Sequence, residues 1–154
     1  MPKAVISDAS CFILLKKIDQ LDLLRKIYGS VVTTPTVMSE VRFEMPDWVV
    51  VRKPANTDLE ERLRMVVDRG EASAMVLALE TDDSTLILDD LRARKEARSL
   101  GIEVTGTLGV ILKGKRDGCI SAVDPLIQAI RKTNFRLSKE VEEEVLRLAG
   151  ESEV

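Results

Sequence analysis

Short apolar runs that alternate with helical segments constrain this sequence more than any other feature. The runs cover residues 4–7, 31–33, 48–51, 86–88 and 102–105, and the segments between them carry helix signals. Strands that are buried on both faces read as continuous apolar runs, and alternation of strands with helices is typical of a parallel sheet covered on both sides. The sequence therefore predicts an α/β fold, a three-layer α/β/α arrangement with a central, mainly parallel sheet.

Local signals place the helices between these runs. Thr34 and Pro35 have the residue types of an N-cap and a first helical position. Residues 57–60 have capping-box form and predict a helix that runs to Arg69 and stops at Gly70, before a separate helix over 71–80. The remaining helices are predicted after the first strand, over 19–28 and 92–100, from 106–109 to near 118, and from Asp124 and Ser138.

The chain length of 154 residues predicts one domain over residues 1–154, with the C-terminal helices beginning at about residue 124. No apolar run approaches the ~18 residues that span a bilayer, and the first residues do not resemble a signal peptide. Cys11 and Cys119 lie far apart without metal-ligand spacing, so we expect two reduced, mostly buried thiols. These features predict a cytoplasmic protein without a membrane segment.

Histidine is absent, and the net charge is −3. Without histidine, Ser–His–Asp or Cys–His catalysis, haem ligation by His and most zinc sites are excluded. The net charge does not indicate a nucleic-acid partner, although a local basic patch remains compatible with it. Any acid–base or metal chemistry must therefore come from Asp and Glu.

Several acidic residues occupy positions from which a parallel sheet would bring them together. Asp8 directly follows the first strand, and Asp89 and Asp90 follow the fourth, so both lie on the rim where open α/β sheets bind ligands. Glu71 stands at a helix start, and Glu40 lies on a helix that can point it toward the same rim. Ordinary alternatives are a helix cap for Asp8, a loop and cap for Asp89-Asp90, and solvated helix positions for the two glutamates.

A cluster of such carboxylates needs a cation. Two unit charges about 4 Å apart repel by about 4 kcal/mol at an effective dielectric constant of 20. Oxygen ligands without His or Cys select Mg²⁺ or Mn²⁺. These ions activate water and stabilise charge on a phosphodiester, so the residues point to metal-assisted phosphodiester hydrolysis.

Five segments together resemble the PIN-domain family, and in particular its VapC-like branch of toxin ribonucleases. They are Val5-Ile6-Ser7-Asp8-Ala9-Ser10, Pro35-Thr36-Val37-Met38-Ser39-Glu40-Val41, Gly70-Glu71-Ala72-Ser73-Ala74, Leu86-Ile87-Leu88-Asp89-Asp90-Leu91-Arg92-Ala93-Arg94 and Thr105-Gly106-Thr107-Leu108-Gly109-Val110. The resemblance implies a PIN-like fold and a ribonuclease that uses Mg²⁺ or Mn²⁺ and acts as the toxin of a toxin–antitoxin pair.

Carried over by position, the resemblance implies a set of acidic catalytic and metal-binding residues. Glu71 replaces an Asp that many relatives carry, which leaves the number of bound ions open. Asp90 is preferred over Asp89 as the fourth acid, although both remain metal-ligand candidates. The catalytic set is Asp8, Glu40, Glu71 and Asp90, and the metal-binding set adds Asp89.

Two hydroxyls and a basic segment complete the predicted site. Ser10 matches a position that in relatives orients the first acid or a water, and Thr107 is expected to add a second hydroxyl. Arg92, Arg94 and Lys95 follow the fourth acid on one helix and are predicted to contact RNA phosphates, unless they form a solvated helix face. The predicted partners are RNA, a second copy of the chain in a homodimer, and a small antitoxin that places a cation in the acidic pocket.

Three other interpretations fit these residues less well. A PIN fold that has lost activity could serve as an RNA- or protein-binding module, although all four acid positions are occupied. A receiver-type signalling domain needs an acidic pair directly after the first strand, where Asp8 stands alone. A haloacid-dehalogenase-type phosphatase needs Asp-x-Asp, whereas this chain has Asp8-Ala9-Ser10.

Overall fold

A five-stranded parallel sheet forms the centre of the protein. The computed structural model describes residues 3–152, so the predicted domain limits of 1–154 include four residues outside the described part. The strand order is β3-β2-β1-β4-β5, and every neighbouring pair is parallel. The strands are β1 (Ala4–Ser7), β2 (Val31–Thr33), β3 (Val49–Val51), β4 (Ser84–Ile87) and β5 (Val104–Thr105).

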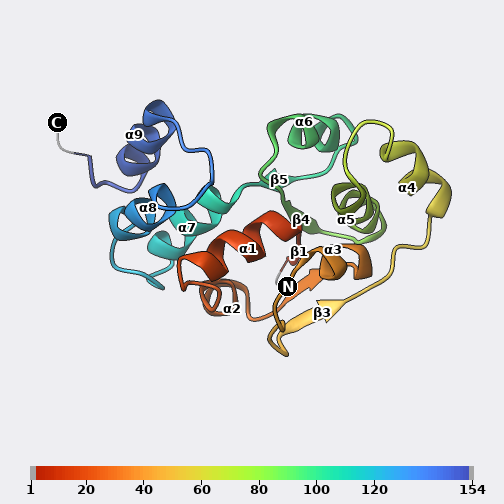
Figure 1. Ribbon diagram of the computed structural model, residues 1–154, viewed down its shortest axis with the longest axis horizontal. Coiled ribbons are helices and arrows are strands. Elements are labelled where there is room, and N and C mark those ends of the chain that lie inside the picture. The colour runs from red at the N-terminus through yellow and green to blue at the C-terminus, as the bar shows by residue number, and fades with distance from the viewer. Residues whose placement is uncertain (1–2, 153–154) are drawn as a thin grey trace.

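Helices cover both faces of this sheet, which confirms the predicted three-layer α/β/α fold (Figure 1). From the central strand β1, the chain first proceeds to β2 and β3 on one side, and later forms β4 and β5 on the other side. Right-handed crossovers in these two directions place the helices that follow β1 on one face of the sheet. They place the helices that precede and follow β4 on the opposite face. The C-terminal helices gather at one end of the molecule, and α4 lies at the other (Figure 1). The helices are α1 (Ala9–Lys17), α2 (Leu23–Tyr28), α3 (Pro35–Glu40), α4 (Thr57–Leu63), α5 (Arg69–Glu80), α6 (Leu91–Ser99), α7 (Thr107–Arg116), α8 (Asp124–Arg131) and α9 (Lys139–Leu148).

The register of the sheet aligns the carboxyl ends of its strands. Ser7 pairs with Ile87, which in turn pairs with Thr105, while Ile6 pairs with Val32. The residues that follow β1 and β4 therefore emerge side by side at one rim. The strand order also reverses at β1, and such a reversal opens the crevice in which α/β sheets bind ligands.

Helix α5 is the most deeply enclosed helix of the described chain. Its residues from Gly70 to Ala78 are all buried, including the charged Glu71. Five of these nine positions carry Gly, Ala or Ser, and small side chains let a helix backbone approach its neighbours closely. The helix packs against β1, β4, α3 and α4, so its first turn reaches the same rim as the carboxyl end of β1.

The start of α5 differs from the prediction. Gly70 was expected to end one helix, whereas it lies inside α5. Asp68 is the N-cap, and Asp68 and Glu71 form a capping box with bonds in both directions. Their mutual bonds satisfy two backbone N–H groups at the helix start, and this outweighs the low helix propensity of glycine.

Two predicted helices are shorter in the structure. The helix predicted over 57–69 is α4, which ends at Leu63 and is capped by Asn56 rather than by Thr57. The helix predicted over 19–28 begins only at residue 23, and Asp19 lies outside it with a φ of 60°, which a right-handed helix cannot contain.

The structure agrees with the prediction of two unpaired, mostly buried thiols. Cys11 is buried and Cys119 partly buried, and neither forms a disulfide. Within residues 3–152, no helix has both the length and the apolar character needed to cross a bilayer.

Candidate active site

Asp8 occupies the carboxyl end of β1 and is almost completely buried, with 6% of its surface exposed. It stands at the N-cap position of α1, yet its side chain makes no capping hydrogen bond. Within the described residues, its Oδ1 atom is buried without any hydrogen-bond partner. Buried polar atoms are nearly always paired in folded proteins. The helix-cap explanation for Asp8 therefore fails, and the unpaired oxygen is available to a ligand.

Burial raises the pKa of Asp8 to about 8, because a charged carboxylate loses its hydration there. A backbone hydrogen bond from Ala9 opposes this rise, whereas the charges of Asp68, Glu71 and Glu40 add to it. The surroundings of Asp8 are thus acidic on several sides. A bound cation would relieve both the desolvation and the repulsion.

Glu40 is the last residue of α3 and lies against the start of α5. Thr34 fixes the beginning of α3, since its hydroxyl accepts a hydrogen bond from Val37 N at 3.1 Å. A methyl group at Gly70 would lie 2.6 Å from Glu40 Oε2 and 2.7 Å from Oε1. The absence of a side chain at Gly70 therefore makes room for this carboxylate. Burial, followed by the charge of Asp68, raises the pKa of Glu40.

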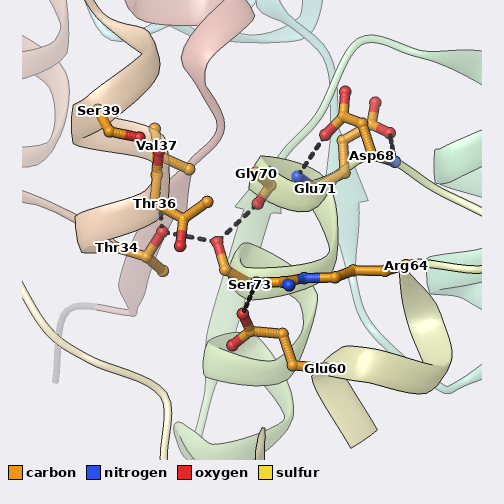
Figure 2. A network of polar contacts seen from close by, with 10 residues as sticks. All are labelled: Thr34, Thr36, Val37, Ser39, Glu60, Arg64, Asp68, Gly70, Glu71 and Ser73. Carbon is orange, nitrogen blue, oxygen red and sulfur yellow. Dashed lines mark hydrogen bonds and ion pairs between the residues drawn. The ribbon is translucent and has the colours of Figure 1, made fainter.

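Glu71 and Asp68 lie next to each other at the first turn of α5 (Figure 2). Asp68 N donates to Glu71 Oε1 at 3.0 Å, and Glu71 N donates to Asp68 Oδ1 at 2.8 Å. Burial raises the pKa of Glu71 to about 7; the hydrogen bond from the Asp68 backbone opposes this, and the charges of Asp68 and Asp90 add to it. Glu71 is consequently held in one orientation within an acidic environment.

Asp68 was not among the predicted site residues. Its charge nevertheless acts on three of the predicted acids, Asp8, Glu40 and Glu71. The sequence contained a signal for its position, because Asp68-Arg69-Gly70-Glu71 has the form of a capping box. Only the folded chain shows that this cap faces the end of β1.

Asp89 is held by three hydrogen bonds at the end of the β4 segment. Thr107 N donates to its Oδ1 at 2.7 Å, and the Thr107 hydroxyl donates to its Oδ2 at 2.7 Å. Ser10 Oγ donates to the same Oδ2 at 3.0 Å. Both predicted hydroxyls thus lie at an acidic residue. Ser10 orients Asp89, however, and not the first acid, Asp8, as the resemblance implied.

Asp90 has a different role from its neighbour. Its side chain caps α6 by accepting a hydrogen bond from Ala93 N at 2.8 Å, and the residue is exposed. Its charge still reaches Glu71. One oxygen of Asp90 therefore acts as a helix cap, as the alternative interpretation of this residue expected. Both Asp89 and Asp90 remain candidates for the fourth acid.

The three predicted RNA-binding residues do not share one surface. Arg92 and Lys95 are exposed on α6. Arg94 is half-buried and turns toward the site, because a methyl group at Gly106 would lie 3.2 Å from its Nη1 and 3.1 Å from Asp89 Oδ1. A solvated helix face is therefore an adequate description of Arg92 and Lys95, but not of Arg94.

The donor types of this site fit a hard divalent cation such as Mg²⁺ or Mn²⁺, since every candidate ligand is a carboxylate or hydroxyl oxygen. Among residues 3–152, however, no three His, Cys, Asp or Glu side chains are grouped closely enough to hold an ion as they stand. Glu71 is engaged in the capping box and Asp90 caps α6. The acids share one rim, and the unpaired Asp8 oxygen favours a cation, but the coordination sphere is not preformed.

Comparison with known proteins identifies a matching family. A family model described as a PIN domain matches residues 4–151, which is nearly the whole chain. A search of curated proteins found no match.

Proposed function

Because this chain belongs to the PIN-domain family, whose members are generally metal-dependent nucleases, we propose that it is a ribonuclease that hydrolyses RNA phosphodiester bonds with Mg²⁺ or Mn²⁺. The observation that carries the proposal is the buried Asp8 carboxylate, which has an unpaired oxygen and acidic neighbours at the end of the central strand. The charged form of such a group is costly unless a cation binds it.

The candidate ligands have distinct tasks in this proposal. Asp8 supplies an oxygen that no group among residues 3–152 satisfies, and Glu40, Glu71 and either Asp89 or Asp90 supply further carboxylates. Asp89 enters with its orientation already fixed by Thr107 and Ser10, and such outer partners keep a ligand aligned. Glu71 accepts the Asp68 backbone N–H through Oε1, so its Oε2 can become a ligand while that hydrogen bond remains. When bound, the ion activates a water molecule and neutralises charge on the phosphodiester.

RNA cleavage by the purified protein tests the proposal directly. End-labelled single-stranded and structured RNAs are incubated with Mn²⁺ or Mg²⁺, and EDTA is expected to stop cleavage. Asp8→Asn should abolish cleavage while the circular dichroism spectrum stays unchanged. Asp58→Asn on α4 is the matched control, because Asp58 is an exposed carboxylate outside the candidate ligand set. Intact RNA in every metal-containing reaction would contradict the proposal.

We further propose that the nuclease acts in the cytoplasm as the toxin of a toxin–antitoxin pair. The small antitoxin would place a cationic side chain among the carboxylates around Asp8, where the charges of Asp68, Glu71 and Glu40 already act on Asp8. Growth arrest on expression of the wild type, but not of Asp8→Asn, supports the toxin role. Unimpaired growth with active nuclease in the cell would rule it out.

A homodimer is the third part of the proposal. The open edge of the sheet at β3 exposes Val50 and Val51, with 39% and 45% of their surface accessible. Exposed apolar residues on an edge strand are usually covered by a partner or protected by charge. Sedimentation at micromolar concentration should show twice the mass of the chain, and a monomer would refute the dimer.

One observation favours a second candidate function, a PIN-fold RNA- or protein-binding module without activity. The acids are not arranged as a preformed ion site within the described residues. Calorimetric titration with Mn²⁺ separates the two functions. The nuclease is expected to bind Mn²⁺ through Asp8, whereas the inactive module would bind RNA without binding the metal.

A further inference from the structure

A cavity of about 360 Å³ opens directly beside the candidate active site. Asp89 and Gly106 form the wall that it shares with that site, Arg94 of α6 forms another side, and the segment before α9 closes it with Phe135 and Arg136. Segments that are far apart in the sequence therefore line one hollow. Neither Arg92 nor Lys95 takes part in its lining.

Arg94 lacks the partners that a half-buried guanidinium normally has. Within the described residues, its Nε is buried without a hydrogen-bond acceptor, and no carboxylate forms an ion pair with it. Burial and the charge of Arg98 lower the pKa of Arg94, while the charge of Asp89 raises it. A guanidinium group that lacks a carboxylate partner is suited to bind a phosphate, because its planar N–H groups can form two parallel hydrogen bonds to phosphate oxygens.

Two neighbouring side chains extend this chemistry. Arg136 is an exposed second cation on the cavity wall and forms no ion pair with any residue between 3 and 152. Phe135 is partly buried, packs against the core and supplies an aromatic ring to the lining. Aromatic residues are only 3% of this chain, so few places on it can combine an aromatic ring with two guanidinium groups that lack ion pairs within the described chain. A phosphate and a flat apolar ring are the two parts that this combination binds, and a nucleotide contains both.

The negative charge of Asp89 does not prevent a phosphate from binding nearby. Three hydrogen-bond donors already satisfy its oxygens, two from Thr107 and one from Ser10. These donors disperse part of its charge. The cavity therefore presents two cations, Arg94 and Arg136, and one carboxylate that is already hydrogen-bonded.

We propose that this cavity binds one nucleotide of the RNA next to the cleaved bond, with its phosphate between Arg94 and Arg136 and its base against Phe135. The inference rests on the proposed ribonuclease function and assigns part of its substrate-binding surface. It also gives the segment between α8 and α9 a role in recognition in addition to packing.

Equilibrium binding without metal tests this inference separately from cleavage. The probe is a fluorescent single-stranded oligoribonucleotide in EDTA, and the readout is anisotropy over a range of salt concentrations. Arg94→Gln and Arg136→Gln are each expected to weaken binding about tenfold and to reduce the salt slope by about 0.7, the value for one lost phosphate contact on a single strand. Phe135→Ala should also weaken binding about tenfold and leave the salt slope unchanged, because stacking releases no counterions.

Arg62→Gln is the matched control, since Arg62 is an exposed arginine on α4 and the substitution changes the net charge equally. If Arg94→Gln and Arg136→Gln bind RNA as Arg62→Gln does, the cavity is not an RNA subsite, and a protein partner becomes the better occupant. Arg136 is exposed, so its variant keeps the test valid if Arg94→Gln fails to fold. Wild-type protein that binds no RNA overturns the inference, whereas binding through these residues without cleavage in Mn²⁺ overturns only the proposed function.

Discussion

The hydroxyl groups of Thr34 and Ser73 lie 2.7 Å apart and join the start of α3 to α5 (Figure 2). Ser73 donates its single hydrogen to the carbonyl of Gly70 at 2.8 Å, so Thr34 must be the donor to Ser73. Thr34 in turn accepts from Val37 N. This buried chain of hydrogen bonds couples the helix that carries Glu40 to the helix start that carries Glu71.

A double-mutant cycle with Thr34→Val and Ser73→Ala should detect this coupling. Both hydroxyls are fully buried, so we expect a coupling free energy of about 1 kcal/mol in urea unfolding. The exposed hydroxyl of Ser39, which also bonds a backbone carbonyl, provides the control, and Ser39→Ala should change stability by less than about 0.5 kcal/mol. Strictly additive effects of the two substitutions would show that the pair is not coupled.

Gly70→Ala should separate metal affinity from stability. The added methyl group meets only the end of the flexible Glu40 side chain, at 2.6–2.9 Å from its Oε2, Oε1 and Cδ atoms, so the carboxylate must move. Alanine also favours a helical position by up to about 1 kcal/mol over glycine. We expect unchanged or higher stability in urea together with weaker Mn²⁺ binding by calorimetry. Unaltered Mn²⁺ affinity would remove Glu40 from the ligand set.

Metal-free stability should decrease as the pH rises. Asp8 has a pKa of about 8 in the folded chain and an ordinary value of 3.8 when unfolded, so the folded state holds the extra proton between these values. Because the native state binds more protons there, Asp8 alone lowers the free energy of unfolding by roughly 1.4 kcal/mol per pH unit, and Glu71 adds to this slope below about pH 7. Urea unfolding in EDTA from about pH 5 to pH 8 measures this slope.

Asp8→Asn is the control for that pH dependence. The variant should lose the Asp8 contribution and become more stable than the wild type at about pH 8, while Glu71, with its pKa of about 7, retains a smaller slope. A variant that melts markedly lower at every pH would identify Asp8 as a structural residue and refute its assignment as a metal ligand.

Mn²⁺ should stabilise the wild-type chain through Asp8. A ligand that binds only the folded state at about 100 times its dissociation constant adds about 2.7 kcal/mol. Thermal or urea unfolding with and without Mn²⁺ measures this gain, and Asp8→Asn should lose it. An equal gain in the variant would mean that the ion binds elsewhere on the protein.

Patterns that act over a few residues were predictable from the sequence alone. The apolar runs identified the strands, and Thr34-Pro35 identified the start of α3, because caps and strand burial depend on neighbouring residues. The parallel order then placed Asp8 and Asp89 at one rim without knowledge of any side-chain contact. The acid-bearing segments could therefore be predicted along with the fold.

Contacts between distant segments were decided only by the tertiary structure. The sequence did not show that Asp68 would face Asp8, that Ser10 would bond Asp89, or that Arg94 would turn toward Gly106. Nor could it bring Phe135 and Arg136 to the wall beside Asp89. Each of these relationships depends on how helices pack and which rotamers the packing permits, and no local propensity encodes that choice.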